Sequence, residues 1–308
     1  MIALQSMPDH RQWLAVRQGQ ALTPRLQSHQ YAAAELDEQS LQGNGWHVIT
    51  GGLGGLGRLS AAWLAGRGAQ RIALLVRRRH DDTADFTAYL HQCYGVTVTC
   101  LICDVADMMA LNVVLNRLQA DGGVAGVIHA AGIPDGSLFL AGSADQPATV
   151  LAVKAHAART IYDRLREAGN PSYLLLYSSA AAALGSTGQT GYALASGYLD
   201  GLAYEAATDD NPVRVTSVGW GAWGETGMAA DKSLQKAFAS EGMGTLSDAE
   251  GLWHLEQALS RGSAYRLAMR VLPGRINADR RRLLQMPEQT PPPRRNNSTG
   301  TDHGFTGR

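Results

Sequence analysis

The sequence predicts a doubly wound parallel α/β sheet of the kind that binds dinucleotides. Strand-like and helix-like segments alternate after residue 45, the strand-like runs are continuously apolar, and a glycine-rich turn follows the first of them. Strands that are buried on both faces have this composition, because helices cover a parallel sheet on each side. The right-handed rule for crossover connections then gives the doubly wound arrangement.

The elements follow one another in a regular order. The strand-like runs cover residues 46–50, 71–76, 96–102, 124–130, 172–178, 213–219 and 265–271. Helical patterns lie between them, near residues 55–66, 82–94, 107–120, 145–168, 189–208 and 247–260.

The turn after the first strand is the most informative stretch of the chain. It fits both GxGxxG and TGxxxGxG. A strand that turns through glycines into a helix directs backbone N–H groups and the helix dipole at an anion, and glycine allows a pyrophosphate to approach closely. A glycine-rich surface loop is the alternative. The residues that we expect at the dinucleotide are Thr50, Gly51, Gly52, Leu53, Gly54, Gly55, Leu56 and Gly57.

The end of the second strand predicts which dinucleotide binds. Arg77 and Arg78 follow that strand, and no carboxylate occurs before Asp81. An acidic residue at this place binds the ribose hydroxyls of NAD, whereas arginine accommodates the 2′-phosphate of NADP. We therefore expect NADPH, with a solvated basic loop as the alternative. Asp104, followed by Val105, ends the third strand and is placed to meet the adenine amine, unless it serves only as a turn residue.

Composition excludes several classes of protein. Among 308 residues, 27 basic side chains balance 27 acidic ones, so no general attraction to nucleic acid or to an anionic membrane is implied. No signal-peptide pattern occurs at the start, and no apolar run approaches the ~20 residues that span a bilayer, so we expect a cytoplasmic protein. Cys100 and Cys103 form a CxxC, which suggests redox chemistry or half a zinc site. Their strand-like context and the lack of a second pair favour structural thiols.

Composition also suggests three segments. Residues 1–43 do not fit the alternation and end near a polar, glycine-containing joint. Residues 44–285 form the predicted Rossmann domain. Residues 286–308 are rich in proline and polar side chains, which predicts a disordered linker.

Three side chains are candidates for the reaction centre, which in open α/β sheets lies beyond the carboxyl ends of the strands. Ser179 ends an apolar strand, Tyr192 follows it near the start of a helix, and Lys154 occupies a nearly uncharged helical stretch. Each has a simpler interpretation: a serine that caps a helix, a core aromatic ring, and a solvated lysine.

At these residues the chain resembles the ketoreductase domain of modular polyketide synthases, a branch of the short-chain dehydrogenase/reductases. The resemblance runs from about residue 44 to 275. It is carried by the glycine turn, the HAAG stretch 129–132, Lys154, Ser178-Ser179 with GSTGQ 185–189, Tyr192, and VGWGAWG 218–224 with 227–229. Residues 11–26 resemble the end of the family's non-catalytic structural subdomain, so we expect a remnant of that subdomain and an excised fragment of a longer chain.

The resemblance implies NADPH-dependent reduction of a β-ketoacyl thioester on an acyl carrier protein, beside other polyketide synthase domains. Tyr192 would donate the proton, Lys154 would bring its pKa toward the working range, and Ser179 would hydrogen-bond the carbonyl oxygen. His129 would be structural. The implied cofactor contacts also include Ala130, Ala131, Gly132, Gly219 and Trp220, and the implied substrate contacts are Gly136, Leu184, Thr187, Gln189, Trp223 and Met228. Residues 225–246 would form a mobile lid.

The chain departs from the family at three places. Ser196 stands four residues after Tyr192, where the family usually has asparagine, which weakens the expected proton relay. Gly136 and Leu184 replace the two residues that mark stereochemical subtypes, so the product configuration is not predicted. Two alternatives therefore stay open: a catalytically silent, cofactor-binding module of a polyketide synthase, and a free-standing reductase of a small ketone.

Overall fold

The protein divides into two compact units, Met1–Gln30 with Asn277–Arg308 and Tyr31–Ile276. The computed structural model describes residues 15–17, 20–22, 25–26, 41–133, 145–186, 188–207, 212–227, 231–260 and 263–284. The tail expected from residue 286 lies outside these residues, as does most of the segment 1–43.

The smaller unit contains a short hairpin and one helix. Strands β1 (Ala15–Arg17) and β2 (Gln20–Leu22) pair antiparallel, and α10 (Ala278–Leu283) comes from the other end of the chain. The two ends meet where the Leu26 N–H donates to the Leu283 carbonyl at 2.8 Å.

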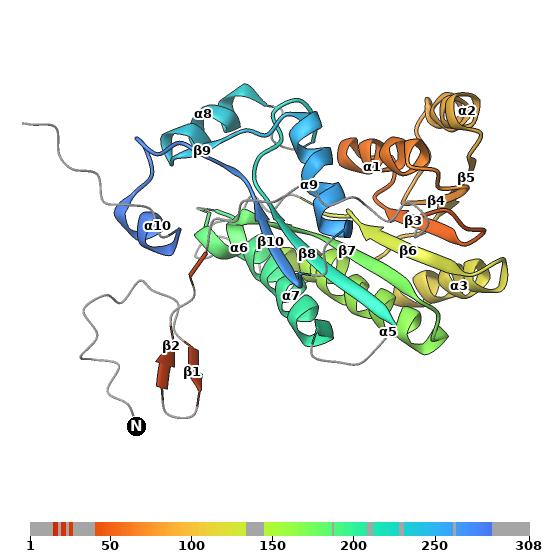
Figure 1. Ribbon diagram of the computed structural model, residues 1–308, viewed down its shortest axis with the longest axis horizontal. Helices are drawn as coiled ribbons and strands as arrows, with labels where there is room; N and C mark the ends of the chain where they lie inside the picture. Colours follow the sequence, from red (N-terminus) through yellow and green to blue (C-terminus); the bar gives the residue numbers. More distant parts are fainter. Residues whose placement is uncertain are drawn as a thin grey trace, which may run out of the picture. The chain divides into compact units, whose positions relative to one another are not determined.

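The larger unit is built on a seven-stranded parallel sheet in the order β10-β8-β7-β6-β3-β4-β5 (Figure 1). The fold class predicted from the sequence is confirmed. The strands are β3 (Trp46–Thr50), β4 (Arg71–Val76), β5 (Thr97–Ile102), β6 (Val124–His129), β7 (Ser172–Ser179), β8 (Val213–Trp220) and β10 (Tyr265–Ala268).

The last predicted strand, 265–271, is interrupted. It leaves the main sheet after Ala268, and β11 (Arg270–Val271) instead pairs antiparallel with β9 (Met243–Gly244). The first part of this predicted strand therefore belongs to the main sheet, and its last two residues belong to a separate small sheet.

Helices cover both faces of the main sheet. Helices α1, α2 and α9 lie on one side and α3, α5 and α7 on the other (Figure 1). The helices are α1 (Gly55–Gly66), α2 (Thr83–Tyr94), α3 (Met108–Ala120), α4 (Asp145–Leu151), α5 (Ala157–Ala168), α6 (Ala180–Leu184), α7 (Thr190–Ala207), α8 (Lys232–Ser240) and α9 (Asp248–Ser260). The predicted helix 145–168 is divided by a π-helical segment, η3 (Ala152–His156), and α6 and α8 were not predicted.

Alternate residues of each strand enter opposite cores. In β3, Ile49 packs into the core under α1 and Val48 into the core under α3, and both are fully buried. Burying such a side chain contributes about 1.5–3 kcal/mol, so the continuous apolar runs stabilise both layers together.

The strand order reverses between β3 and β6. From β3 the chain continues to β4 and β5 on one side, and it then returns to β6 on the other side of β3. Ligands bind at the carboxyl edge beside such a reversal. Among the described helices, none is long and apolar enough to cross a membrane.

Candidate active site

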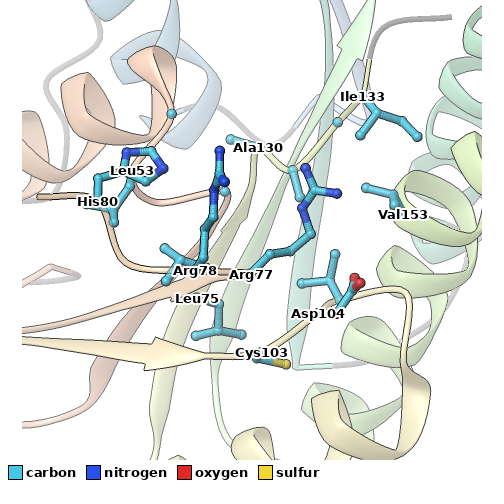
Figure 2. Close-up of a pocket in the computed structure, with 16 residues that line it drawn as sticks. Leu53, Leu75, Arg77, Arg78, His80, Cys103, Asp104, Ala130, Ile133 and Val153 are labelled. Atoms are coloured by element: carbon cyan, nitrogen blue, oxygen red, sulfur yellow. The ribbon is translucent and has the colours of Figure 1, made fainter. Parts of the chain in front are cut away.

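Two adjoining cavities open at the carboxyl edge of the sheet. The first, which we call the arginine cavity, has a volume of about 620 Å³ and is lined by Arg77 and Arg78 (Figure 2). The second, the tyrosine cavity, has a volume of about 490 Å³ and is lined by Lys154 and Tyr192. They share part of their walls, formed by Gly51, Gly54, Ala130, Ala131 and Gly132.

The glycine turn forms the shared floor. Gly51 has φ +66°, a left-handed conformation that favours glycine, and its would-be Cβ would lie 3.0 Å from the Ala131 Cα. A side chain at Gly57 would collide with the Gly51 carbonyl. Helix α1 begins directly after this turn, and its first N–H groups have no acceptor within the helix. The turn therefore presents backbone donors to both cavities.

Arg77 and Arg78 direct their guanidinium groups into the arginine cavity (Figure 2). Both side chains are exposed, and among the described residues neither has a hydrogen-bond or ion-pair partner. Arg79 does not line the cavity; it lies beside Cys100, where its charge opposes the effect of burial, which raises the pKa of that thiol. The two cavity arginines are thus free to bind an anion.

Asp104 lines the same cavity together with Val105. Its carboxylate also accepts the Ala106 N–H at 3.0 Å, so it serves as a turn residue as well. The neighbouring thiol of Cys103 is buried, and burial raises its pKa to about 11. No metal-binding cluster is found in the part of the chain that the structure describes.

The tyrosine cavity brings together three distant segments. The Lys154 ammonium lies 4.1 Å from the centre of the Tyr192 ring and donates to the Tyr177 carbonyl at 3.0 Å. Lys154 is only 1 % exposed. Ser179 lines the same cavity, and its hydroxyl oxygen accepts the Ala181 N–H at 3.1 Å, which caps α6. That bond uses the oxygen of Ser179 as acceptor, so the hydroxyl proton can still be donated into the cavity.

A wide helical turn directs Lys154. In η3, the Ala157 N–H bonds to the Ala152 carbonyl, five residues back rather than four. Such π-segments cost regular hydrogen bonding and occur often at functional sites. Here the Lys154 carbonyl accepts a hydrogen bond from outside the helix, from the His129 ring at 3.0 Å.

His129 ties the lysine segment to the glycine turn. Because a carbonyl only accepts, Nε2 carries the proton toward Lys154, and Nδ1 accepts from the Thr50 hydroxyl at 2.8 Å. The Thr50 oxygen in turn accepts the Ala131 N–H at 3.1 Å. Complete burial lowers the pKa of His129 to about 4, so the ring is neutral near pH 7. These bonds support the structural role expected for it.

A buried polar network lies beneath the cavity. Ser217 donates to the Asp200 carboxylate at 2.6 Å, and Ser178 donates to the Ser196 carbonyl at 3.1 Å. Burial raises the pKa of Asp200, while the hydrogen bond from Ser217 and the charge of Lys154 act in the opposite direction. The Ser196 hydroxyl is fully buried and has no partner among the described residues.

The other predicted residues divide into three groups. Lining the tyrosine cavity are Gly55, Leu56, Gly57, Gln189, Trp220 and Trp223, and Leu53 lines the arginine cavity. Five predicted residues line neither cavity: Thr50, Gly52, Leu184, Ser196 and Gly219. Gly219 lies within β8, where a Cβ would be 2.6 Å from the Tyr265 hydroxyl, so its small size serves packing. Outside the described residues are Gly136, Thr187 and Met228.

Sequence reasoning missed an apolar wall and a histidine. Leu234 and Phe238 from α8, with Met243, line the tyrosine cavity, within the segment expected to be a lid. The signal was present: Asp231 caps α8 through the Ser233 N–H, and apolar residues follow at helical spacing. His80 lines the arginine cavity, a position that depends on the turn before α2.

Comparison with known proteins gives one consistent group of relatives. A sequence profile described as the KR domain matches residues 45–225, more than half of the chain. The spectinabilin polyketide synthase system protein NorA′ of Streptomyces orinoci is 35% identical over 268 residues, which cover 84% of this chain and 7% of that protein. The pikromycin polyketide synthase component PikAIII of Streptomyces venezuelae is 34% identical over 234 residues, 73% of this chain and 14% of that protein. The chain therefore spans a small part of the curated relatives that it matches.

Solved structures agree. A-type ketoreductases from a modular polyketide synthase match with a TM-score of 0.75 and 30% identity, covering 88% of this chain and 58% of theirs. A C2-type ketoreductase from a modular polyketide synthase matches with a TM-score of 0.76 and 29% identity, with the same coverage.

Proposed function

Because the chain belongs to the KR domain family of polyketide synthases, we propose that it reduces the β-keto group of an acyl thioester with NADPH. The observation that carries this proposal is the convergence of Lys154, Tyr192 and Ser179 at one cavity that adjoins the glycine turn. An acyl chain bound to a carrier protein is the proposed substrate, and the proposed partners are the neighbouring domains of a polyketide synthase.

The residues present fit the cofactor. Side chains at Gly51 and Gly57 would collide with the protein itself, so the turn stays bare backbone. Two exposed arginines that have no acceptor among the described residues line the cavity beyond it. Arginine matches the geometry of phosphate oxygens with two parallel donors. When bound, NADPH supplies the hydride that reduces the carbonyl carbon. Arg77 and Arg78 would hold its 2′-phosphate, and Asp104 would face its adenine.

The chain's own side chains would handle the proton and the developing charge. Tyr192 donates its phenolic proton to the ketone oxygen, so that the ketone becomes a secondary alcohol and Tyr192 a phenolate. Lys154 stabilises that phenolate because its ammonium lies 4.1 Å from the ring and is shielded from water. Ser179 donates its hydroxyl hydrogen to the same oxygen, which stabilises charge that grows in the transition state.

The apolar wall supports an acyl substrate. Leu234, Phe238 and Trp223 line the tyrosine cavity, and they present no charge to a substrate chain. We extend the proposal to the domain division 1–43, 44–285 and 286–308, and to a cytoplasmic location.

A second candidate is a cofactor-binding module without turnover. The buried, unpartnered hydroxyl of Ser196 favours it, because this position carries asparagine in the family and serine leaves the site without that amide. A reductase of a small free ketone is the third.

One experiment separates the three. The protein is incubated with NADPH and a β-ketoacyl thioester, either on a carrier protein or on a short pantetheine mimic, and the consumption of NADPH and the hydroxyacyl product are measured. The proposal expects product with both, and faster with the carrier. A silent module binds NADPH without product, and a small-ketone enzyme gains nothing from the carrier.

A further inference from the structure

We propose that His80 is a third ligand of the cofactor's 2′-phosphate, beside Arg77 and Arg78, and so helps the site to distinguish NADPH from NADH. This inference rests on the proposed cofactor and names a residue to which neither the glycine pattern nor the arginine run points. His80 lines the arginine cavity together with Leu53, Gly54 and Arg78. In Figure 2 its ring lies beside Leu53 and next to Arg78, at the end of the cavity opposite Asp104.

The turn that carries His80 is held by its backbone. The His80 N–H donates to the Thr83 hydroxyl at 2.8 Å, and the Thr83 N–H donates back to the His80 carbonyl at 3.0 Å. These bonds start helix α2 and do not involve the imidazole. The ring can therefore be removed without loss of the bonds that shape the turn.

A neighbouring carboxylate, Asp82, is bound to another partner, although the charge of His80 also acts on it. Asp82 accepts from Arg58 at 2.7 Å, and this hydrogen bond holds the pKa of the carboxyl below its usual range. Arg58 is itself fixed, because it also donates to the Leu53 carbonyl at 3.1 Å and lies over the Phe86 ring at 4.7 Å. The imidazole of His80 makes no hydrogen bond within the described residues.

The chemistry of the ligand explains why a third donor matters. A phosphate monoester presents three strong acceptor oxygens and close to two negative charges. Two guanidinium groups and one imidazole N–H together offer donors from two sides of such a group. NADH has no 2′-phosphate, so a contribution from His80 acts on NADPH alone.

The test is a titration of NADPH and of NADH into the whole chain, followed by cofactor fluorescence. For His80→Ala we expect NADPH binding to weaken by roughly 3- to 10-fold, the range of one hydrogen bond at a solvent-exposed site, with NADH binding unchanged. His80→Lys should restore NADPH binding, because it returns an N–H donor to this place. Arg79→Ala is the matched control: it removes a neighbouring charge that lies beside Cys100 and outside the cavity, and it should alter neither affinity.

The possible results distinguish a failure of the role proposed for His80 from a failure of the NADPH proposal. Unchanged NADPH binding in His80→Ala, or equal weakening of NADPH and NADH, overturns the inference. A wild-type chain that prefers NADH overturns the proposed cofactor itself, and with it the premise for His80. Equal losses in Arg79→Ala and His80→Ala also overturn the inference, because they indicate general loss of positive charge.

Discussion

The two cavities differ in how their positively charged side chains are surrounded. In the arginine cavity, Arg77 and Arg78 are exposed and have no acceptor in the described part of the chain. In the tyrosine cavity, Lys154 is 1 % exposed and is held by a backbone carbonyl and an aromatic ring. Exposed charges are screened by water and contribute little to the stability of the fold. A buried charge is destabilising unless the surrounding residues provide hydrogen-bond partners for it. Changes in the first cavity should therefore alter affinity, and changes in the second should alter turnover.

The largest expected effect tests the tyrosine side. Tyr192→Phe removes the proposed proton donor and keeps the ring beside Lys154, so we expect reduction to fall by about 10²- to 10⁴-fold while NADPH binding is retained. Steady-state rates and cofactor fluorescence measure the two quantities. If NADPH binding falls as much as turnover, it is wrong that the arginine cavity determines affinity and the tyrosine cavity determines turnover.

Low pH should destabilise the fold around the tyrosine cavity, because His129 becomes protonated there. Burial lowers the pKa of His129 from 6.5 to about 4, so its neutral form stabilises the fold fully above pH 6.5, and this stability is lost as the pH falls toward 4. The same holds for His47 in β3, whose buried ring lies between the Leu41 carbonyl and the Tyr173 hydroxyl. We expect each to remove up to about 3 kcal/mol from the free energy of unfolding across this window.

Denaturant titrations at several pH values between 7 and 4 measure that loss. His129→Gln should lower stability at pH 7 and flatten the acid dependence, because it removes one titrating ring. A free energy of unfolding that stays constant from pH 6.5 to 4.5 in the wild-type chain contradicts the assignment of neutral, buried imidazoles.

Changes in the arginine cavity should alter the preference for NADPH over NADH. Replacing both Arg77 and Arg78 with alanine should reduce the preference for NADPH over NADH by about 10- to 100-fold, because two charge-assisted contacts are lost. Thermal stability should change little, since neither side chain has a partner in the described chain. Binding constants for both cofactors give the ratio, and an unchanged ratio rejects the 2′-phosphate assignment.

The smallest expected effect concerns Ser196. Its buried hydroxyl has no partner among the described residues, so Ser196→Ala should change turnover by less than about twofold. Ser196→Asn returns an amide to the position and should raise kcat several-fold. A fall in kcat with alanine and no gain with asparagine shows that serine already performs the role.

Much of the fold follows from local pattern. Apolar runs such as Ile72 to Val76 predict buried parallel strands, and each pairs as the order of the sheet requires. The helix α8 was missed although Asp231 and its apolar spacing indicate it, because Lys232–Ser240 lies between glycines and has no buried residue. The break after Ala268 was missed too, because one apolar run serves two sheets.

The site is predictable where the chemistry requires a residue type. Tyr192, Lys154 and Ser179 line one cavity, as their positions in the sequence suggest. The contacts around them depend on tertiary structure and escape sequence reasoning. Asp200 becomes important only because Ser217 donates to it from a neighbouring strand, and His80 only because its turn faces the glycine loop.

The wide turn at Lys154 has a consequence for protein engineering. The Lys154 carbonyl accepts both the Ala157 N–H and the His129 ring, so we expect that the lysine cannot be transplanted alone into another scaffold. A designer who moves this reaction centre must carry the five-residue segment and its imidazole partner as one module.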